Sequence, residues 1–420
     1  MEPAKGIEDG DGTGSGMSVL AIIGGQIVTA DGVTDGDVLV RDGRIEAVGA
    51  IDVPADAERI DAKGRLVAPG LIDVGVFAAD LPAFAAGGVT RALLMPDQAQ
   101  PLDTVALVQH AKRDTSAAIH PLAAATRGLA GEELAELGLM ARAGARGAAT
   151  GRSWIGDAGV MRRVLDYAAA QGLRTIAHAE DAGLTGDAVM TEGETATRLG
   201  LAAAPAEAEA LAVARDLLLV EITGAPLHFR QVTTARALTL IRDAKARGLP
   251  VTCGITPAHL LLADSAVTGF RTFARLSPPL RAESDRQACI AAIKDGTIDL
   301  ICSAHDPHGP EAKRLPFADA SAGMVGAETL LALSLQLVRD EVIGLPRLFD
   351  LLSGAPARLF GLPGGSITAG SVADLLLVDA GAPWRIDSAA LAAAAGNTPF
   401  DGLPVQGRVI ATIKGGKRLA

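Results

Sequence analysis

The side chains best suited to chemistry lie in two short segments of the chain. One is His178-Ala179-Glu180-Asp181, and the other runs from Cys302 to His308 through His305 and Asp306. Imidazole, carboxylate and thiolate groups are the side chains that ligate zinc or transfer protons. Two or three donors of the second segment could therefore hold a metal ion together with His178. The alternative is a structural loop, because a His-x-x-His pair outside a helix is a weak zinc signal.

The individual groups of these segments each admit two interpretations. His178 could act as a general base, or it could be fixed by hydrogen bonds to a neighbouring loop. Glu180 and Asp181 could take part in catalysis, or they could cap the next helix and pair with an arginine. The remaining histidines belong to no ligand pattern, and we interpret them as structural: His110, His120, His228 and His259.

Alternating strands and helices must position these segments. The spacing of apolar residues predicts repeated strand–helix units through the middle of the chain. Such repeats predict an α/β fold, a TIM-like (β/α)8 barrel over residues 68–363, with functional loops at the carboxyl ends of its strands. The expected strands are 90–95, 175–178, 250–254 and 298–302, and the expected helices are 102–113, 160–171, 235–247 and 286–294.

Both ends of the chain have a different pattern. Residues 18–67 and 364–420 contain short apolar runs separated by glycine and Asp-Gly pairs, which indicates strands joined by tight turns. We expect these stretches to pair into one small β-sandwich domain. Residues 1–17 are acidic and rich in glycine, and we expect them to form a disordered extension rather than a signal peptide.

Composition disfavours several classes of protein. The net charge of −11 and the pI near 5.2 argue against a nucleic-acid surface, which would need a basic face. No apolar run is long enough to predict a membrane span, so we expect a cytoplasmic protein. The three cysteines (Cys253, Cys289 and Cys302) are an odd number without CxxC spacing, which disfavours a disulfide framework or a thiolate zinc cluster.

Several short motifs follow one another along the chain in a distinctive order. They include VAPGLID at 67–73, AAGGVT at 85–90, HAED at 178–181, SPPLR at 277–281 and AHDPH at 304–308. Their order and spacing resemble the dihydroorotase family of the amidohydrolase superfamily, from about Leu20 onward. The resemblance implies a hydrolase that interconverts carbamoyl-aspartate and dihydroorotate. It also implies a zinc-bound hydroxide and a strand-end aspartate as general acid or base.

The same resemblance implies that the metal centre of this chain is degenerate. A glycine offers no donor atom, and a phenylalanine places apolar carbon where a metal ion should lie. His178 is the retained family ligand, and we expect neither a catalytic residue nor a bound cofactor. The positions that should carry the missing ligands and base are Gly75, Phe77, Thr150, Gln231 and Ala304.

Positions that should bind the substrate have also changed. The family's substrate arginine aligns with Ala79, and residues that normally follow it are missing, so the loop and helix after the first barrel strand should be short. Asp97 stands where relatives carry asparagine. Arg281 could still contact an anion or substrate, or it could form a salt bridge with Glu283 or Asp285.

These observations predict two functions from different classes. The first is a non-catalytic, oligomeric partner of aspartate transcarbamoylase in pyrimidine biosynthesis, similar to degenerate dihydroorotases that scaffold this enzyme. The alternative is an active dihydroorotase, or a related cyclic-amide hydrolase, that binds zinc through a non-standard site. A third possibility is a barrel that binds a pyrimidine precursor without turning it over. No nucleic-acid or membrane partner is expected.

Overall fold

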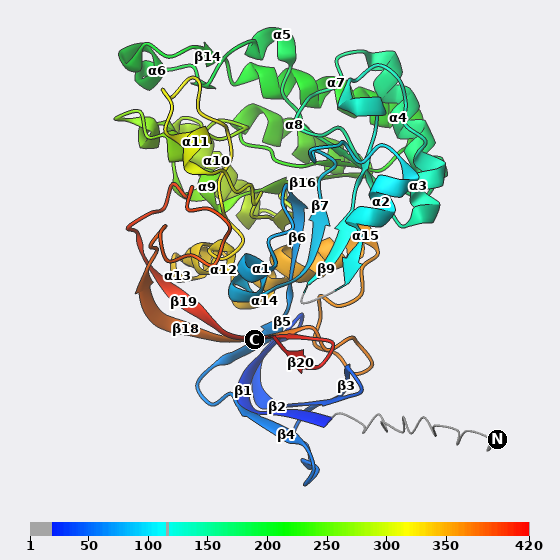
Figure 1. The fold of residues 1–420 in the computed structure, drawn as a ribbon, viewed down its shortest axis with the longest axis vertical. Helices are drawn as coiled ribbons and strands as arrows, with labels where there is room; N and C mark the ends of the chain where they lie inside the picture. The colour runs from blue at the N-terminus through cyan, green and yellow to red at the C-terminus, as the bar shows by residue number, and fades with distance from the viewer. Residues whose placement is uncertain (1–18, 115–116, 420) are drawn as a thin grey trace, which may run out of the picture.

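The computed structural model describes residues 19–114 and 117–419, which form a barrel above a smaller β domain (Figure 1). The predicted disordered extension, residues 1–17, lies outside the described residues. Parallel strands form the barrel, and β9 and β10 together make up one strand position of it. In order they are β6 (Leu71–Val76), β7 (Val89–Leu94), β9 (Ala118–Pro121), β10 (Ala123–Ala124), β11 (Ala148–Ala149), β12 (Thr175–Ala177), β15 (Leu227–Phe229), β16 (Val251–Ile255) and β17 (Leu300–Ile301).

A backbone hydrogen bond closes the ring between its first and last strands. The N–H of Phe77, directly after β6, donates to the carbonyl oxygen of His305, after β17, over 2.8 Å. Because the strands run parallel, their carboxyl ends all lie at one face, where the functional loops of such barrels lie.

Helices cover the outside of the barrel. In α4 the buried residues recur every three or four positions, and the Asp157 side chain accepts a hydrogen bond from the N–H of Val160 to cap the first turn. The barrel helices are α1 (Leu81–Gly87), α2 (Val105–Ala111), α3 (Leu137–Ala143), α4 (Ala158–Ala170), α7 (Glu207–Thr223), α8 (Ala235–Ala246), α10 (Glu283–Lys294) and α15 (Ala355–Phe360). Shorter elements are α5 (Ala182–Thr185), α6 (Glu194–Leu199), α9 (Pro257–Leu261), α11 (Pro310–Lys313), α12 (Leu330–Ser334), α13 (Gln336–Arg339), α14 (Leu345–Phe349) and the strand pair β13 (Met190–Thr191) and β14 (Ala203–Ala204).

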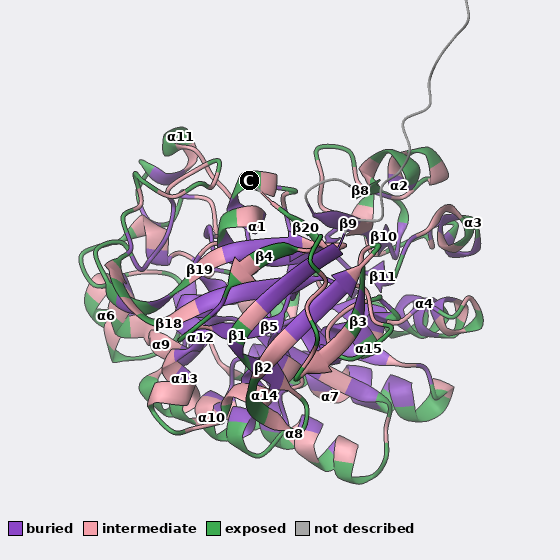
Figure 2. Ribbon diagram, turned by 90° about the horizontal axis from the view of Figure 1, so that it is seen from below, coloured by how far each residue is buried: buried purple, intermediate pink, exposed green. Residues whose placement is uncertain are grey.

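Strands from both ends of the chain build the second domain. They share one sheet in the order β20-β19-β18-β5-β1-β2-β3, with β4 beside β1, and Figure 2 shows their buried surfaces from below. The predicted fold class, a barrel with a small β domain from both chain ends, is therefore confirmed. The strands are β1 (Val19–Thr29), β2 (Gly32–Arg41), β3 (Arg44–Gly49), β4 (Glu58–Asp61), β5 (Leu66–Pro69), β18 (Leu375–Arg385), β19 (Pro404–Lys414) and β20 (Lys417–Arg418).

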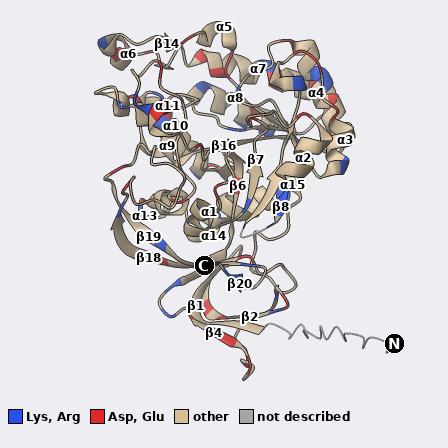
Figure 3. Ribbon diagram, viewed as in Figure 1, with Lys and Arg blue, Asp and Glu red and all other residues tan. Residues whose placement is uncertain are grey.

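One predicted element differs from the structure, and another predicted feature agrees with it. Helix α2 is shorter than the predicted 102–113, because the chain turns into the strand β8 (Arg113–Asp114). Helix α1 begins at Leu81, directly after β6, in agreement with the predicted shortening of this connection. Acidic and basic residues are mixed on outer helices such as α4 and α7 (Figure 3). No helix within the described residues is long and apolar enough to span a membrane.

Candidate functional site

The residues predicted to replace the metal site meet at the carboxyl ends of the barrel strands. Phe77 follows β6, Gln231 follows β15 and Ala304 follows β17, and all three line one cavity at the barrel mouth. The cavity measures about 20 Å³. A space of this size holds roughly one water molecule, far less than a pyrimidine precursor needs.

A buried arginine that we did not predict lies at the centre of this group. Gly75 adopts the left-handed region (φ +84°), and a Cβ atom there would point at Arg230, 3.4 Å from its Cδ. The Arg230 guanidinium lies 5.1 Å from the centre of the Phe77 ring, and its Nη2 is 3.3 Å from Nδ1 of His178. Only 2% of Arg230 is exposed. The sequence feature that could have revealed Arg230 is its position directly after a fully buried strand, where a charged residue is unusual.

His178 is held through both of its ring nitrogens. Because a guanidinium can only donate, Nδ1 must accept from Arg230, and the proton lies on Nε2, 3.3 Å from an Oε2 of Glu180. The backbone N–H of His178 donates to Oγ1 of Thr150 over 3.0 Å. These bonds favour the structural interpretation of His178 over a general base or a metal ligand.

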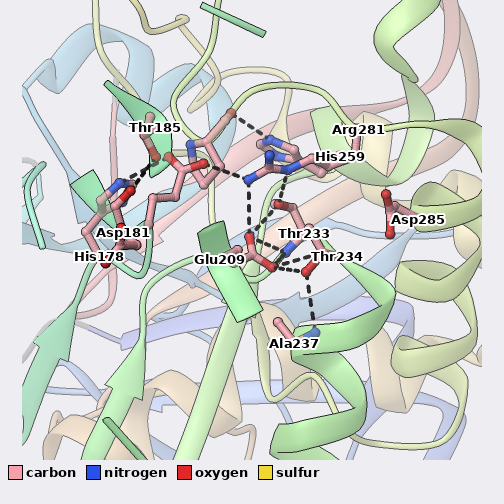
Figure 4. Close-up of polar contacts among 12 residues, drawn as sticks. His178, Asp181, Thr185, Glu209, Thr233, Thr234, Ala237, His259, Arg281 and Asp285 are labelled. Atoms are coloured by element: carbon pink, nitrogen blue, oxygen red, sulfur yellow. Dashed lines mark hydrogen bonds and ion pairs between the residues drawn. The ribbon is translucent and has the colours of Figure 1, made fainter. Parts of the chain in front are cut away.

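Arg281 and Glu209, both labelled in Figure 4, belong to a buried ion-pair network that also contains Glu180. Nη2 of Arg281 lies 2.7 Å from Oε1 of Glu180 and 3.6 Å from Oε2 of Glu209. Burial opposes ionisation of Glu180, but the hydrogen bond from His178 and the charge of Arg281 lower its pKa to about 2. The predicted pairing of Arg281 with Glu283 or Asp285 is wrong. Glu283 pairs with Arg286, and Asp285 accepts from the backbone N–H of Ala235. The 2% exposed Arg281 reaches across the barrel instead.

Glu209 anchors the network from helix α7, a role that no pattern in the sequence indicated. Its carboxylate is fully buried and accepts hydrogen bonds from the backbone N–H and hydroxyl groups of both Thr233 and Thr234, at 2.6–3.0 Å. Thr233 also accepts from Nε of Arg281 over 2.9 Å. Arg281 is therefore used inside the protein, which favours a structural role over contact with an anion.

The neighbouring Asp181 has a purely local role. Its carboxylate accepts from the N–H of Leu184 over 2.9 Å, which caps helix α5 as expected for an acidic residue at a helix N-terminus.

The His305–His308 segment is also engaged in internal contacts. Nε2 of His305 lies 3.2 Å from Asp80, and its Nδ1 accepts from backbone N–H groups. Asp306 lies between Nη1 of Arg152 (2.8 Å) and Nε2 of His308 (3.1 Å). His305 therefore points to a different partner from Asp306 and His308, which contact each other, as the structural-loop interpretation expects.

The residues at the barrel mouth do not fit a metal ion. Burial raises the pKa of the Cys302 thiol to about 12, so a thiolate is disfavoured. Ala304 occupies the place of the expected base and adopts a left-handed backbone (φ +48°), which suits aspartate or asparagine better than alanine. Across residues 19–114 and 117–419, no three His, Cys, Asp or Glu side chains gather as a metal site.

The closed ring of strands and the loops at its mouth define an amidohydrolase-type barrel. The model of the amidohydrolase family matches residues 86–419. A dihydroorotase from Trichlorobacter lovleyi is 38% identical over 417 residues, and one from Geobacter metallireducens is 40% identical; each comparison covers 95% of this chain and 98% of the relative. The L-hydantoinase (dihydropyrimidinase) from Arthrobacter aurescens has a TM-score of 0.86 at 26% identity, with 96% of both chains covered. The chain belongs to the amidohydrolase family and is dihydroorotase-like.

Proposed function

We propose that this chain is a non-catalytic dihydroorotase-like protein that acts as a structural partner of aspartate transcarbamoylase in pyrimidine biosynthesis. The single observation that carries the proposal is the content of the barrel mouth. Gly75, Phe77, Gln231 and Ala304 offer neither the ligands nor the base of the reaction, while the framework around them is complete. A retained fold does not imply a retained activity, so a chain with this combination would act through its surface.

The internal contacts at the mouth support the same proposal. His178 is engaged at both ring nitrogens, and the cavity has room for roughly one water molecule. An enzyme site would need free ligands and space for its substrate. The small cavity also disfavours a sensor that binds a pyrimidine precursor at the barrel mouth.

Co-expression with aspartate transcarbamoylase from the same organism tests the partner role. We expect the two chains to elute together from a sizing column as one large complex. We also expect transcarbamoylase activity to fall when this chain is omitted. Separate elution with unchanged transcarbamoylase activity would overturn the proposal.

An activity measurement tests the non-catalytic part separately. Protein purified with zinc in the medium should contain no stoichiometric metal by elemental analysis, and it should not cyclise carbamoyl-aspartate. One or two zinc ions per chain together with turnover would favour the alternative, an active cyclic-amide hydrolase with a non-standard site.

A further inference from the structure

We propose that the guanidinium of Arg230 has replaced the metal centre of this barrel: it occupies the ligand-binding space and supplies a fixed positive charge there. The proposal rests on the loss of the metal ligands described above and is independent of any partner. It predicts that restoring the missing ligands is not enough to restore metal binding, because the cation must also be removed.

The space around Arg230 is shaped by the positions that depart from the family pattern. At Gly75 the missing side chain leaves room for the aliphatic part of Arg230, which a Cβ would approach to 3.4 Å. Phe77 turns an aromatic ring to within 5.1 Å of the guanidinium carbon, inside the range of a cation–π interaction. His178, the retained ligand, contributes its Nδ1 lone pair to Nη2 of Arg230 over 3.3 Å.

Arg230 therefore suits three positions, and at Phe77 it shares the ring with Arg152, whose guanidinium carbon lies closer, at 3.6 Å. Gly75 leaves space for the arginine side chain. Phe77 presents an aromatic face to the guanidinium where a metal site would have a nitrogen ligand. His178 accepts a hydrogen bond from the guanidinium through the lone pair that would otherwise bind a metal. Separate, unrelated losses of ligands would not be expected to leave side chains that all suit the same guanidinium.

The charge of Arg230 is poorly compensated by its surroundings. Among the described residues no carboxylate forms an ion pair with it, and its Nε and Nη1 have no hydrogen-bond partner. Burial lowers the pKa of Arg230, but a guanidinium keeps its proton at neutral pH. A dication entering this space would meet a unit positive charge a few ångströms away in a medium of low dielectric constant.

Metal binding by two matched variants tests the proposal. The first carries Gly75→His, Phe77→His and Gln231→His, and the second carries the same changes together with Arg230→Ser. We expect Co²⁺ to bind the second variant at least roughly 100-fold more tightly than the first, measured by metal content after dialysis and by visible absorption. Equal Co²⁺ binding by the two variants would overturn the proposal.

A third variant controls for a general effect of charge. It combines the three histidine substitutions with Arg152→Ser, which removes a neighbouring arginine that stacks on Phe77 from 3.6 Å and is 37% exposed at its side chain. We expect this variant to bind Co²⁺ as weakly as the one that keeps both arginines. Recovery of binding here to the level of the Arg230→Ser variant would show that nearby charge, rather than occupation of the site by Arg230, is responsible.

A measurement on the unaltered chain keeps the proposal testable if the multiple variants do not fold. Nitrogen NMR of ¹⁵N-histidine-labelled protein should show His178 as the tautomer with its proton on Nε2, because Arg230 donates to Nδ1. In the single variant Arg230→Met this preference should weaken, and in Arg230→Lys it should persist. An Nδ1–H tautomer of His178 in the unaltered chain would overturn the proposal.

Discussion

The substitution Glu209→Ala should strongly destabilise the barrel. Its carboxylate accepts hydrogen bonds from two backbone N–H groups and two hydroxyls, those of Thr233 and Thr234, and it lies 3.6 Å from Arg281. The hydroxyls can turn to other acceptors, but the backbone N–H groups cannot. Each buried, unsatisfied donor costs about 1–3 kcal/mol, so the two N–H groups together cost about 2–6 kcal/mol. Arg281 keeps its closer partner Glu180, so its charge is not left unpaired. We therefore expect the free energy of unfolding to fall by about 2–6 kcal/mol.

Urea denaturation followed by circular dichroism measures this loss. The matched control is Glu283→Ala, which removes a glutamate whose side chain is 57% exposed and pairs with Arg286 on the surface of α10. An exposed pair contributes about 0–1 kcal/mol, so the control should unfold nearly as the unaltered chain does. If Glu209→Ala were no more destabilising than Glu283→Ala, the buried network would not hold the barrel mouth together.

Three further outcomes are expected. The thermal midpoint of the unaltered protein should not move when a strong chelator is added, and a fall of several degrees in a melting experiment would reveal a structural metal. Because the pKa of Glu180 is lowered to about 2 in the folded state, its contribution of roughly 3 kcal/mol is present above pH 4.5 and is lost as the pH falls toward 2. Urea midpoints of Glu180→Gln and of the unaltered chain should therefore converge over this range, and a constant difference would contradict the assignment. Gly87→Ala would place a Cβ 2.2 Å from the carbonyl oxygen of Ala327 and should lower the free energy of unfolding by at least ~2 kcal/mol. Gly156→Ala should be tolerated, because a Cβ there would lie 4.0 Å from its nearest neighbouring atom.

Local patterns in the sequence were enough to predict the fold class. The alternation of strands and helices predicts the barrel, and an acidic residue at a helix start predicts the cap made by Asp181. Long-range pairs could not be predicted in this way. Arg281 and Glu180 are 101 residues apart in sequence, and Arg230 and His178 are 52 apart, so only the closed barrel brings them together. The erroneous pairing of Arg281 with nearby carboxylates came from treating sequence neighbours as spatial neighbours.

The polar groups at the barrel mouth hold one another in place without a bound ion. Removing a metal centre normally leaves buried ligands without partners, which destabilises a protein. Here the surviving polar groups are joined to one another: His178 to Glu180 and Arg230, and Arg281 to Glu180 and Glu209. These links need no bound ion, so the strand ends can stay fixed when no cofactor is present. The structural partner role proposed above would require a surface of constant shape, and links that need no ion would help to maintain it.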